Sequence, residues 1–427
     1  MSDIIVRENA AFGEKYYYTK HKSGLDIYVL PKKFSGSYAL FSTRYGAIDN
    51  CFKLEGDKDF VKVPDGIAHY LEHKMFENED GTDTFERFAK FGADANAFTS
   101  SEMTAYLFSC TEHFDENLEI LLDYVTKPYF TPQTVQKEQG IIGQEIRMGE
   151  DNPNRALYYN LMEALYEKHQ IKLNVAGTVE SIAEITADLL YSCYRTFYNL
   201  SNMMLVISGD VTMEQVLKTA DKVLPIQEEK KIVRKYEDEK PEVNKKRVVA
   251  QFPVARPMFM IGIKDPDVMS DTALRLKKSV AGEMLFDVLF GGTSEFAIDV
   301  FESGLVRGFG AGYELDHVYG MGTLHGETDD PEKVYDKFVS YVEEKKKTGV
   351  SREDFERVKR ATYATLARWF DSTRVADNFT FLLHDGVDIF DYVEAAKNVR
   401  YEEMQPLLES LFDEKYYAMS VVEPKKD

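Results

Sequence analysis

Alternating apolar and polar residues predict short β-strands over residues 24–31 and 37–48, with a turn between them. A further strand-rich segment covers 94–110, and the apolar run Met203–Ser208 predicts a buried strand closed by Gly209–Asp210. Apolar residues that recur every three or four positions predict a helix that begins near Pro64. The same spacing predicts further helices over 113–126, 132–149, 154–168 and 179–198.

Residues 228–247 interrupt this pattern, because they carry both charge signs, a proline and few apolar residues. Such composition predicts a solvated linker. After it we expect a strand over 248–264, a helix over 274–303, strands over 308–326, helices over 331–348, 351–370, 373–384 and 402–412, and a strand over 416–422. The order echoes the first half and predicts a repeat one half-chain long. The expected fold is α+β, with related domains at 1–228 and 247–427, each an antiparallel sheet covered by helices, and a linker at 229–246.

The overall charge excludes two classes of partner. The 427 residues include 52 Lys and Arg against 73 Asp and Glu, a formal net charge of −21. Nucleic acids and anionic lipid surfaces would be repelled, so neither is expected as a partner. Hydrophobic residues make up 44% of the chain, which is enough to build a core in each of two or three domains.

Cysteine usage and the amino-terminal segment predict a soluble cytoplasmic protein. Cys51, Cys110 and Cys193 are odd in number and widely spaced, which fits a reducing compartment better than a disulfide framework. The first residues lack an apolar stretch of signal-peptide length, and no run approaches the roughly 20 apolar residues of a membrane span.

The segment Pro64–Glu77 contains residues whose types and spacing indicate a chemical function. Its His69 and His73 are four residues apart in a helical pattern, so both imidazoles can point at one position. Glu72 lies beside them, within reach of a water molecule at that position. Two imidazoles and a carboxylate suit a catalytic zinc site, and His-x-x-Glu-His is HExxH in reverse order. The alternative is two surface histidines on an amphipathic helix.

A closed zinc site needs a third protein ligand. The predicted helix 132–149 offers Glu138 and Glu145, which are seven residues apart and therefore on one face. Apolar residues surround Glu145, and a carboxylate in such surroundings is costly to bury unless it is paired or bound to a cation. From the pattern alone, Glu145 is equally consistent with a salt-bridged helix residue.

Several motifs in order resemble the pitrilysin/insulinase family of zinc metallopeptidases, which includes the catalytic subunit of the mitochondrial processing peptidase. The matching segments are HYLEH (69–73), GADANAFTSSEMTAYLF (92–108), EQGIIGQEI (138–146), DNP (151–153), GTVESI (177–182) and NMMLVISGD (202–210). The resemblance covers residues 20–225 and, more loosely, the second half. It implies that Glu145 is the third ligand of one zinc ion and that Glu138 supports the site from outside the ligand shell.

The resemblance also implies how substrate binds. An edge strand around Asn96, Ala97 and Phe98 would accept a peptide as an added strand. The second half of family members often contributes an Arg and a Tyr, and ESGLVRGFGAGYE (302–314) contains Arg307 and Tyr313, although their spacing departs from the family pattern. Strand-edge residues are the alternative. Long family members have four such domains in a clamshell, so this two-domain length implies a clamshell of two chains, as a homodimer or with a related, metal-free chain.

These observations predict a zinc-dependent endopeptidase that hydrolyses oligopeptides or unfolded segments, with Glu72 as the general base that takes a proton from the attacking water. The alternative is a binding or assembly subunit of the same fold. Residues 51–150 contain 20 acidic and 9 basic residues, a net charge of 9 − 20 = −11. This excess is either a solvated acidic face or a field that attracts basic peptides.

Overall fold

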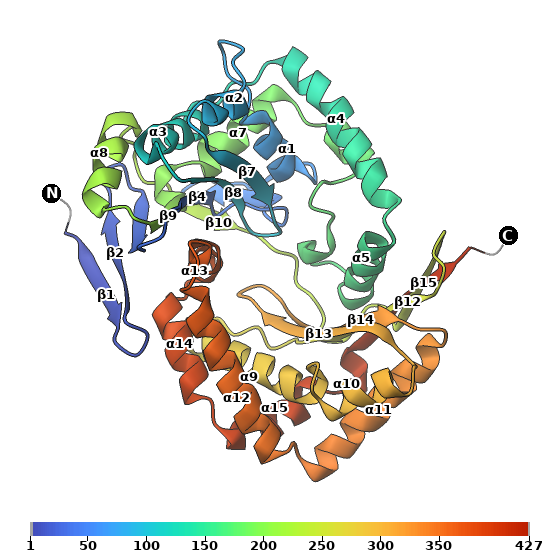
Figure 1. Ribbon diagram of the computed structural model, residues 1–427. Helices are drawn as coiled ribbons and strands as arrows, with labels where there is room; N and C mark the ends of the chain where they lie inside the picture. The colour runs from blue at the N-terminus through green and yellow to red at the C-terminus, as the bar shows by residue number, and fades with distance from the viewer. Residues whose placement is uncertain (1–2, 426–427) are drawn as a thin grey trace. The chain divides into compact units, whose positions relative to one another are not determined.

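The computed structural model describes residues 3–425, and the chain forms two compact units that are not contiguous in sequence. The first unit contains Met1–Ile146, Leu173–Tyr236 and Ala367–His384, and the second contains Arg147–Lys172, Glu237–Leu366 and Asp385–Asp427. Each unit contains a sheet with helices packed on it (Figure 1). The α+β fold with two related sheets is confirmed.

A seven-stranded sheet in the order β1-β2-β3-β9-β4-β8-β7 forms the framework of the first unit. Its strands are β1 (Ile5–Asn9), β2 (Glu14–Lys20), β3 (Asp26–Pro31), β4 (Ser37–Thr43), β7 (Asp94–Thr99), β8 (Thr104–Cys110) and β9 (Met203–Gly209). The apolar strand β9 is central and buried along its whole length, as its sequence predicts. It pairs parallel with β3, whereas the other pairs are antiparallel. A small second sheet has the order β10-β5-β6, from Ile232–Arg234, Cys51–Leu54 and Val61–Lys62.

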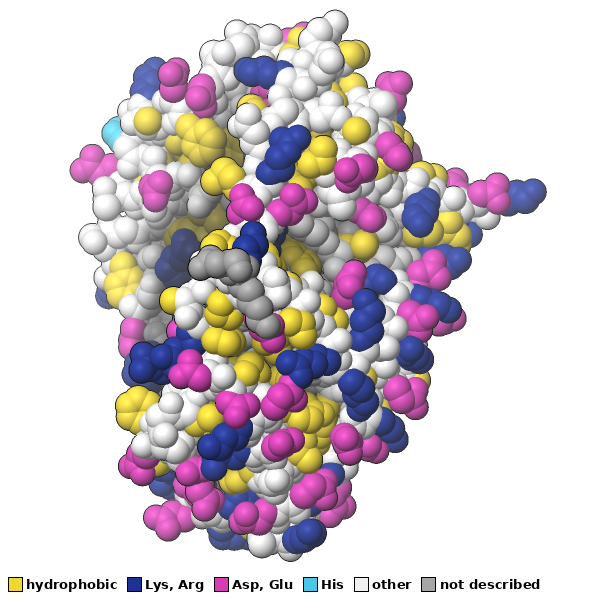
Figure 2. Space-filling model, turned by 90° about the vertical axis from the view of Figure 1, so that its right-hand side faces the viewer, with side chains coloured by type: hydrophobic (Ala, Val, Ile, Leu, Met, Phe, Trp, Pro, Cys, Tyr) yellow, Lys and Arg dark blue, Asp and Glu magenta, His cyan; other side chains and the backbone are white. Residues whose placement is uncertain are grey.

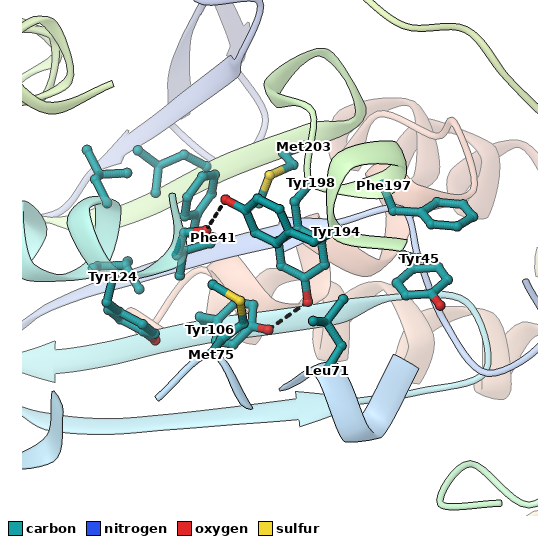
Figure 3. Close-up of a cluster of buried hydrophobic side chains, with 14 of the residues drawn as sticks. Phe41, Tyr45, Leu71, Met75, Tyr106, Tyr124, Tyr194, Phe197, Tyr198 and Met203 are labelled. Atoms are coloured by element: carbon teal, nitrogen blue, oxygen red, sulfur yellow. Dashed lines mark hydrogen bonds between the residues drawn. The ribbon is translucent and has the colours of Figure 1, made fainter. Parts of the chain in front are cut away.

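Aromatic side chains form much of the core between this sheet and its helices. The helices of the unit are α1 (Ile67–Lys74), α2 (Thr84–Ala89), α3 (Phe114–Val125), α4 (Pro132–Glu150), α6 (Val179–Ala183), α7 (Ala187–Phe197), α8 (Met213–Val223) and α13 (Val375–His384). Leu71 of α1 and the following Met75 lie among tyrosines (Figure 3). Of these, Tyr106 and Tyr198 share a hydrogen bond of 2.7 Å between their hydroxyls. The apolar face of α1 is therefore held in the core, which leaves its polar face for chemistry.

The five-stranded sheet of the second unit repeats the topology of the first. Its order is β11-β15-β12-β14-β13, with strands Arg247–Phe252, Tyr417–Pro424, Met258–Lys264, Gly320–Glu327 and Arg307–Leu315. In chain order, the five strands β11 to β15 correspond to β3, β4, β7, β8 and β9 of the first sheet. With this correspondence the order of the second sheet becomes β3-β9-β4-β8-β7, which is the order found in the first sheet. In both sheets the one parallel pair joins the first and the last of these five strands. The half-chain repeat is thus present as topology. Each sheet is antiparallel apart from this pair, because its last strand returns beside the first through a long helical crossover.

One helix of each sequence half packs on the sheet of the other half. Helix α5 (Pro153–Leu165) packs on the second sheet, where a Cβ at Gly262 would lie 2.8 Å from the Leu161 side chain. Helix α13 packs on the first sheet, where Phe379 contacts Tyr16 at 4.9 Å between ring centroids. The Tyr38 hydroxyl donates to Asp377 at 2.6 Å in the same contact. The structure thus corrects the expected contiguous division at 228/229 and 246/247, because each sheet needs an apolar cover that lies far along the chain.

The remaining helices belong mainly to the second unit. They are α9 (Thr272–Phe290), α10 (Glu295–Glu302), α11 (Pro331–Thr348), α12 (Arg352–Trp369), α14 (Ile389–Asn398) and α15 (Met404–Leu411). Two predicted helices are each divided in two: 179–198 at Thr186, which caps α7, and 274–303 at Ser294, which caps α10. The predicted strand 248–264 is divided between Pro253 and Pro257, since proline cannot donate to a ladder. The hairpin β1–β2 and helices α2, α8 and α14 were not predicted.

Part of the expected linker is structured. Strand β10 pairs with β5, and the Arg234 guanidinium lies 2.9 Å from the carboxylate of Asp49, which is only 2% exposed. The Tyr236 hydroxyl donates to the same carboxylate at 3.0 Å. The interpretation of 229–246 as a solvated linker is therefore wrong at 232–236, because partners far away in sequence satisfy the charges that suggested it.

Glu239, in the same segment, stabilises the second unit. Its carboxylate accepts the backbone N–H of Lys168 at 2.7 Å and pairs with the buried Lys264 ammonium at 3.3 Å. Burial alone would raise the pKa of Glu239, but the backbone donors of Lys168 and His169 together with Lys264 lower it to about 2.

We expect Glu239→Gln to destabilise the second unit by about 2 kcal/mol at pH 7. Since the folded pKa lies below the ordinary value of 4.5, this stabilisation is complete above that value and disappears as pH falls through about 2. Calorimetric melting of the variant and wild type from pH 7 to pH 2.5 should give converging melting temperatures. The exposed Glu242 provides the control substitution Glu242→Gln. A difference that is independent of pH would contradict this account.

Candidate metal centre

The start of α1 is fixed by two glycines with positive φ. Gly66 has φ 88°, and a Cβ there would lie 2.5 Å from the Ala176 carbonyl oxygen. Gly177 has φ 72°, and a Cβ there would lie 2.4 Å from the Asp65 carbonyl oxygen, which also accepts the Ser181 hydroxyl at 2.8 Å. Only glycine permits this close approach of two backbones. The GTVESI segment therefore anchors the helix that carries the two histidines.

His69, His73 and Glu145 converge on one position; helix spacing predicted this for the two histidines, and the motif resemblance implied it for Glu145. The Nε2 atoms of His69 and His73 lie 3.6 Å from Glu145 Oε1 and Oε2, respectively, and the three potential ligand atoms lie within 4.8 Å of one another. Ligand atoms about 2.0–2.2 Å from a tetrahedral zinc ion lie roughly 3.3–3.6 Å apart. Two imidazole nitrogens and one carboxylate oxygen within 4.8 Å of one another are a donor set that fits one zinc ion, and three protein ligands leave the fourth tetrahedral position for water or substrate.

Glu138 and Glu145 lie on the same face of α4, and each contacts a different nitrogen of the His73 imidazole. Glu138 Oε1 lies 3.0 Å from His73 Nδ1, so it orients the imidazole with Nε2 towards Glu145. The hydrogen bond to His73 lowers the pKa of Glu138 against the opposing effect of burial. Burial lowers the pKa of His73, but Glu138, Glu72 and Glu145 outweigh it and the pKa is raised. The arrangement is the one expected for a carboxylate that supports a metal-binding histidine.

Glu72 is nearly buried, with 7% of its surface exposed, between the two histidines on α1. Burial raises its pKa, partly offset by a hydrogen bond from Thr99 and by the charge of His73. A carboxylate with a raised pKa accepts a proton more readily near neutrality, which suits a general base. Thr99 was not among the predicted site residues. Its place in the strand, two residues after Ala97 and thus on the same face, is the sequence signal that could have identified it.

Asn96, Ala97 and Phe98 lie on β7, the edge strand of the first sheet. The Asn96 side chain is exposed, and its Oδ1 accepts the Ala97 N–H at 2.9 Å. Phe98 lies on the opposite face from Ala97 and stacks on Phe381 of α13, with ring centroids 6.0 Å apart. One side of β7 pairs with β8, and the other side has no strand partner among residues 3–425.

Arg307 and Tyr313 lie on β13, the edge strand of the second sheet. Arg307 is exposed. Tyr313 is only 9% exposed, its hydroxyl donates to Asp265 at 2.7 Å, and its ring packs on Phe286. Tyr313 is thus a packing residue of the second unit, which corrects the expectation that it contacts substrate. Side chains of β13 alternate between the two faces of the sheet, and Tyr313 lies on the face that packs against α9.

The described residues of the second unit do not form such a cluster by themselves. In its described part, no three His, Cys, Asp or Glu side chains offer ligand atoms that converge as in the first unit. Glu283 of α9 accepts the hydroxyls of Tyr392 at 2.6 Å and Ser279 at 3.4 Å. These contacts satisfy a buried carboxyl without a cation.

Among residues 3–425, no helix is both long and apolar enough to span a membrane.

Comparisons with known proteins match this architecture. The sequence profile "Insulinase (Peptidase family M16)" matches residues 62–179, and "Peptidase M16 inactive domain" matches residues 184–362. "Uncharacterized zinc protease YmfH" of Bacillus subtilis (strain 168) is 38% identical over 402 residues, which cover 93% of this chain and 94% of that protein.

Solved structures agree. An M16-like peptidase from Alicyclobacillus acidocaldarius is 32% identical with a TM-score of 0.92, covering 98% of this chain and 100% of that one. Pitrilysin shares the fold with a TM-score of 0.74 at 13% identity, and this chain covers 47% of it. The chain therefore belongs to the M16, or pitrilysin/insulinase, family of peptidases.

Proposed function

We propose that the protein is a zinc-dependent endopeptidase that hydrolyses oligopeptides or unfolded segments. The observation that carries this proposal is the convergence of His69, His73 and Glu145 next to the nearly buried carboxylate of Glu72. A purely structural use of the fold would not require these four groups together. For that reason the alternative, a binding or assembly subunit, is not favoured.

In this proposal His69, His73 and Glu145 hold one zinc ion, and Glu138 orients His73. When bound, zinc supplies Lewis-acid chemistry at the scissile carbonyl and at the attacking water. Glu72 removes a proton from that water and delivers it to the leaving amine nitrogen. Its burial beside the histidines keeps the carboxylate next to the reacting atoms without making it a ligand.

Strand β7 is the proposed substrate-binding element. Its unpaired side offers backbone N–H and C=O groups to an extended peptide, and Asn96, Ala97 and Phe98 lie along it. Recognition through backbone groups depends on an extended conformation more than on sequence, so folded proteins are poor substrates. The exposed Arg307 on β13 is a second candidate contact for substrate.

The working form is proposed to be a two-chain clamshell in the cytoplasm, either a homodimer or a pair with a related, metal-free chain. The support is that this chain covers about half of pitrilysin, at 47% of its length. Two chains of this size would supply the four domains that a long single chain contains.

The acidic excess raises the question of which peptides are preferred. On the face shown in Figure 2, acidic and basic side chains are interspersed. If the excess in residues 51–150 attracts basic peptides, kcat/KM for Lys/Arg-rich peptides should fall steeply with added salt. Equal kcat/KM values for acidic and basic peptides at low salt would instead indicate that the acidic excess is a solvated face.

The proposed function is tested by digesting a peptide library with the purified full-length chain and reading the products by mass spectrometry. We expect cleavage within peptides, its loss with a zinc chelator, and recovery with about one equivalent of zinc per chain. Candidate partner chains are added in a parallel digest. A zinc-loaded chain that binds peptides but cleaves none, with or without a partner, would contradict the peptidase assignment and support the binding subunit.

A further inference from the structure

Thr99 is the last residue of the edge strand β7, and its hydroxyl contacts the carboxylate of Glu72. Thr99 Oγ1 donates to Glu72 Oε2 at 2.7 Å. We infer that Thr99 is a positioning residue that holds one oxygen of the general base, leaves the other free for the proton of the attacking water, and links the substrate-binding strand to the base. This inference rests on the proposed function and adds a residue to it.

Only one of the two carboxylate oxygens of Glu72 can receive the hydrogen bond from Thr99. A threonine hydroxyl has one proton to donate, and here it points to Oε2 of Glu72. During hydrolysis one O–H bond of water breaks and its proton passes to Oε1, while the oxygen forms the new bond to the carbonyl carbon. The same proton then passes to the leaving nitrogen as the C–N bond breaks. The Thr99 proton stays in place throughout, because Oε2 already faces a donor.

The neighbours of Thr99 keep its side chain from turning away. Thr99 lies opposite Thr104 in the β7–β8 register, with their Oγ1 atoms 3.4 Å apart. Thr104 is fully buried, and its own hydroxyl donates to the Tyr45 carbonyl oxygen at 2.9 Å. A β-branched side chain between the strand and helix α1 has few rotamers. The hydroxyl is therefore ready for Glu72 before any substrate arrives.

Alternation along β7 connects this contact to substrate binding. Thr99 faces α1, whereas the preceding Phe98 faces α13 and stacks on Phe381. A peptide that pairs with the free side of β7 bonds to its backbone and so restrains the strand that carries Thr99. Peptide binding thus steadies the hydrogen bond on which the orientation of Glu72 depends.

The test compares Thr99→Val, which keeps the shape but removes the hydroxyl, with Thr99→Ser, which keeps the hydroxyl. We expect kcat of Thr99→Val to fall roughly 10- to 100-fold with KM within about twofold and zinc content unchanged. Thr99→Ser should recover kcat to within about threefold of wild type. Thr380→Val is the matched control, because Thr380 is buried in the same unit and its hydroxyl donates to the Ala376 carbonyl at 2.7 Å, away from α1. Its kcat should equal that of wild type.

A second readout does not depend on activity. Crystal structures of the zinc-loaded variants should show one conformer of Glu72 in wild type and Thr99→Ser, and several in Thr99→Val. Unchanged kcat in Thr99→Val, equal impairment of Thr99→Ser, or a single unchanged Glu72 conformer in Thr99→Val would each overturn the inference. A wild-type chain that cleaves no peptide would overturn the proposed function instead, and the conformers of Glu72 would still decide whether Thr99 positions it.

Discussion

The Glu72→Gln variant is expected to bind one zinc ion per chain and to hydrolyse peptides at least about a thousandfold more slowly than wild type. Glutamine has nearly the same shape and can still accept the Thr99 hydroxyl, so the helix and the three proposed zinc ligands should not move. It cannot accept a proton from water at neutral pH. Metal analysis and hydrolysis of a quenched peptide library measure the two properties separately.

A neighbouring glutamate provides the control for this result. Glu79 is exposed in the loop that follows α1, and Glu79→Gln should keep the activity of wild type within about twofold. Undiminished cleavage by Glu72→Gln would show that another group takes the proton. Loss of zinc from Glu72→Gln would instead indicate that Glu72 is a ligand.

The Glu145→Ala variant is expected to lose stoichiometric zinc and, with it, all measurable peptidase activity. Its carboxylate contributes one of the three converging ligand groups, and the two imidazoles of His69 and His73 that remain do not close a structural or catalytic zinc site. The loss should appear after equilibration with a chelating buffer and should not be reversed by one equivalent of zinc.

Glu138→Gln should lie between Glu145→Ala and wild type. It keeps all three ligands but weakens the orientation of His73, so zinc affinity should fall about 10- to 100-fold. Competition with a chromophoric chelator measures both variants on one scale. Normal zinc binding by Glu145→Ala would show that the third ligand is a different residue.

The proposed metal-binding residues were accessible from the sequence because their geometry is local. His69 and His73 converge through helix periodicity alone, and the spacing of Glu138 and Glu145 puts both on one face of α4 in the same way. That α4 faces α1 does not follow from spacing, and there the motif resemblance supplied the pairing. The structure places Glu145 3.6 Å from both histidines.

Residues whose position depends on the whole sheet were harder to assign. Tyr313 has a suitable residue type in a glycine-containing strand, yet the packing of that strand buries it on Asp265. Thr99 has no distinguishing residue type, yet register with Thr104 and contact with α1 put it on Glu72. Segments 232–236 and 375–384 likewise acquired their roles from partners that are distant in sequence.

The sequence by itself determined the α+β class, the half-chain repeat and the residue types of the candidate centre. These features depend on periodicity and on residue type, which act within a few turns or strands. Only the tertiary structure decided which helix covers which sheet, where the two units divide, and which hydroxyl donates to Glu72. Those features depend on long-range burial and on the satisfaction of buried polar groups, which are properties of the packed chain and not of any one segment.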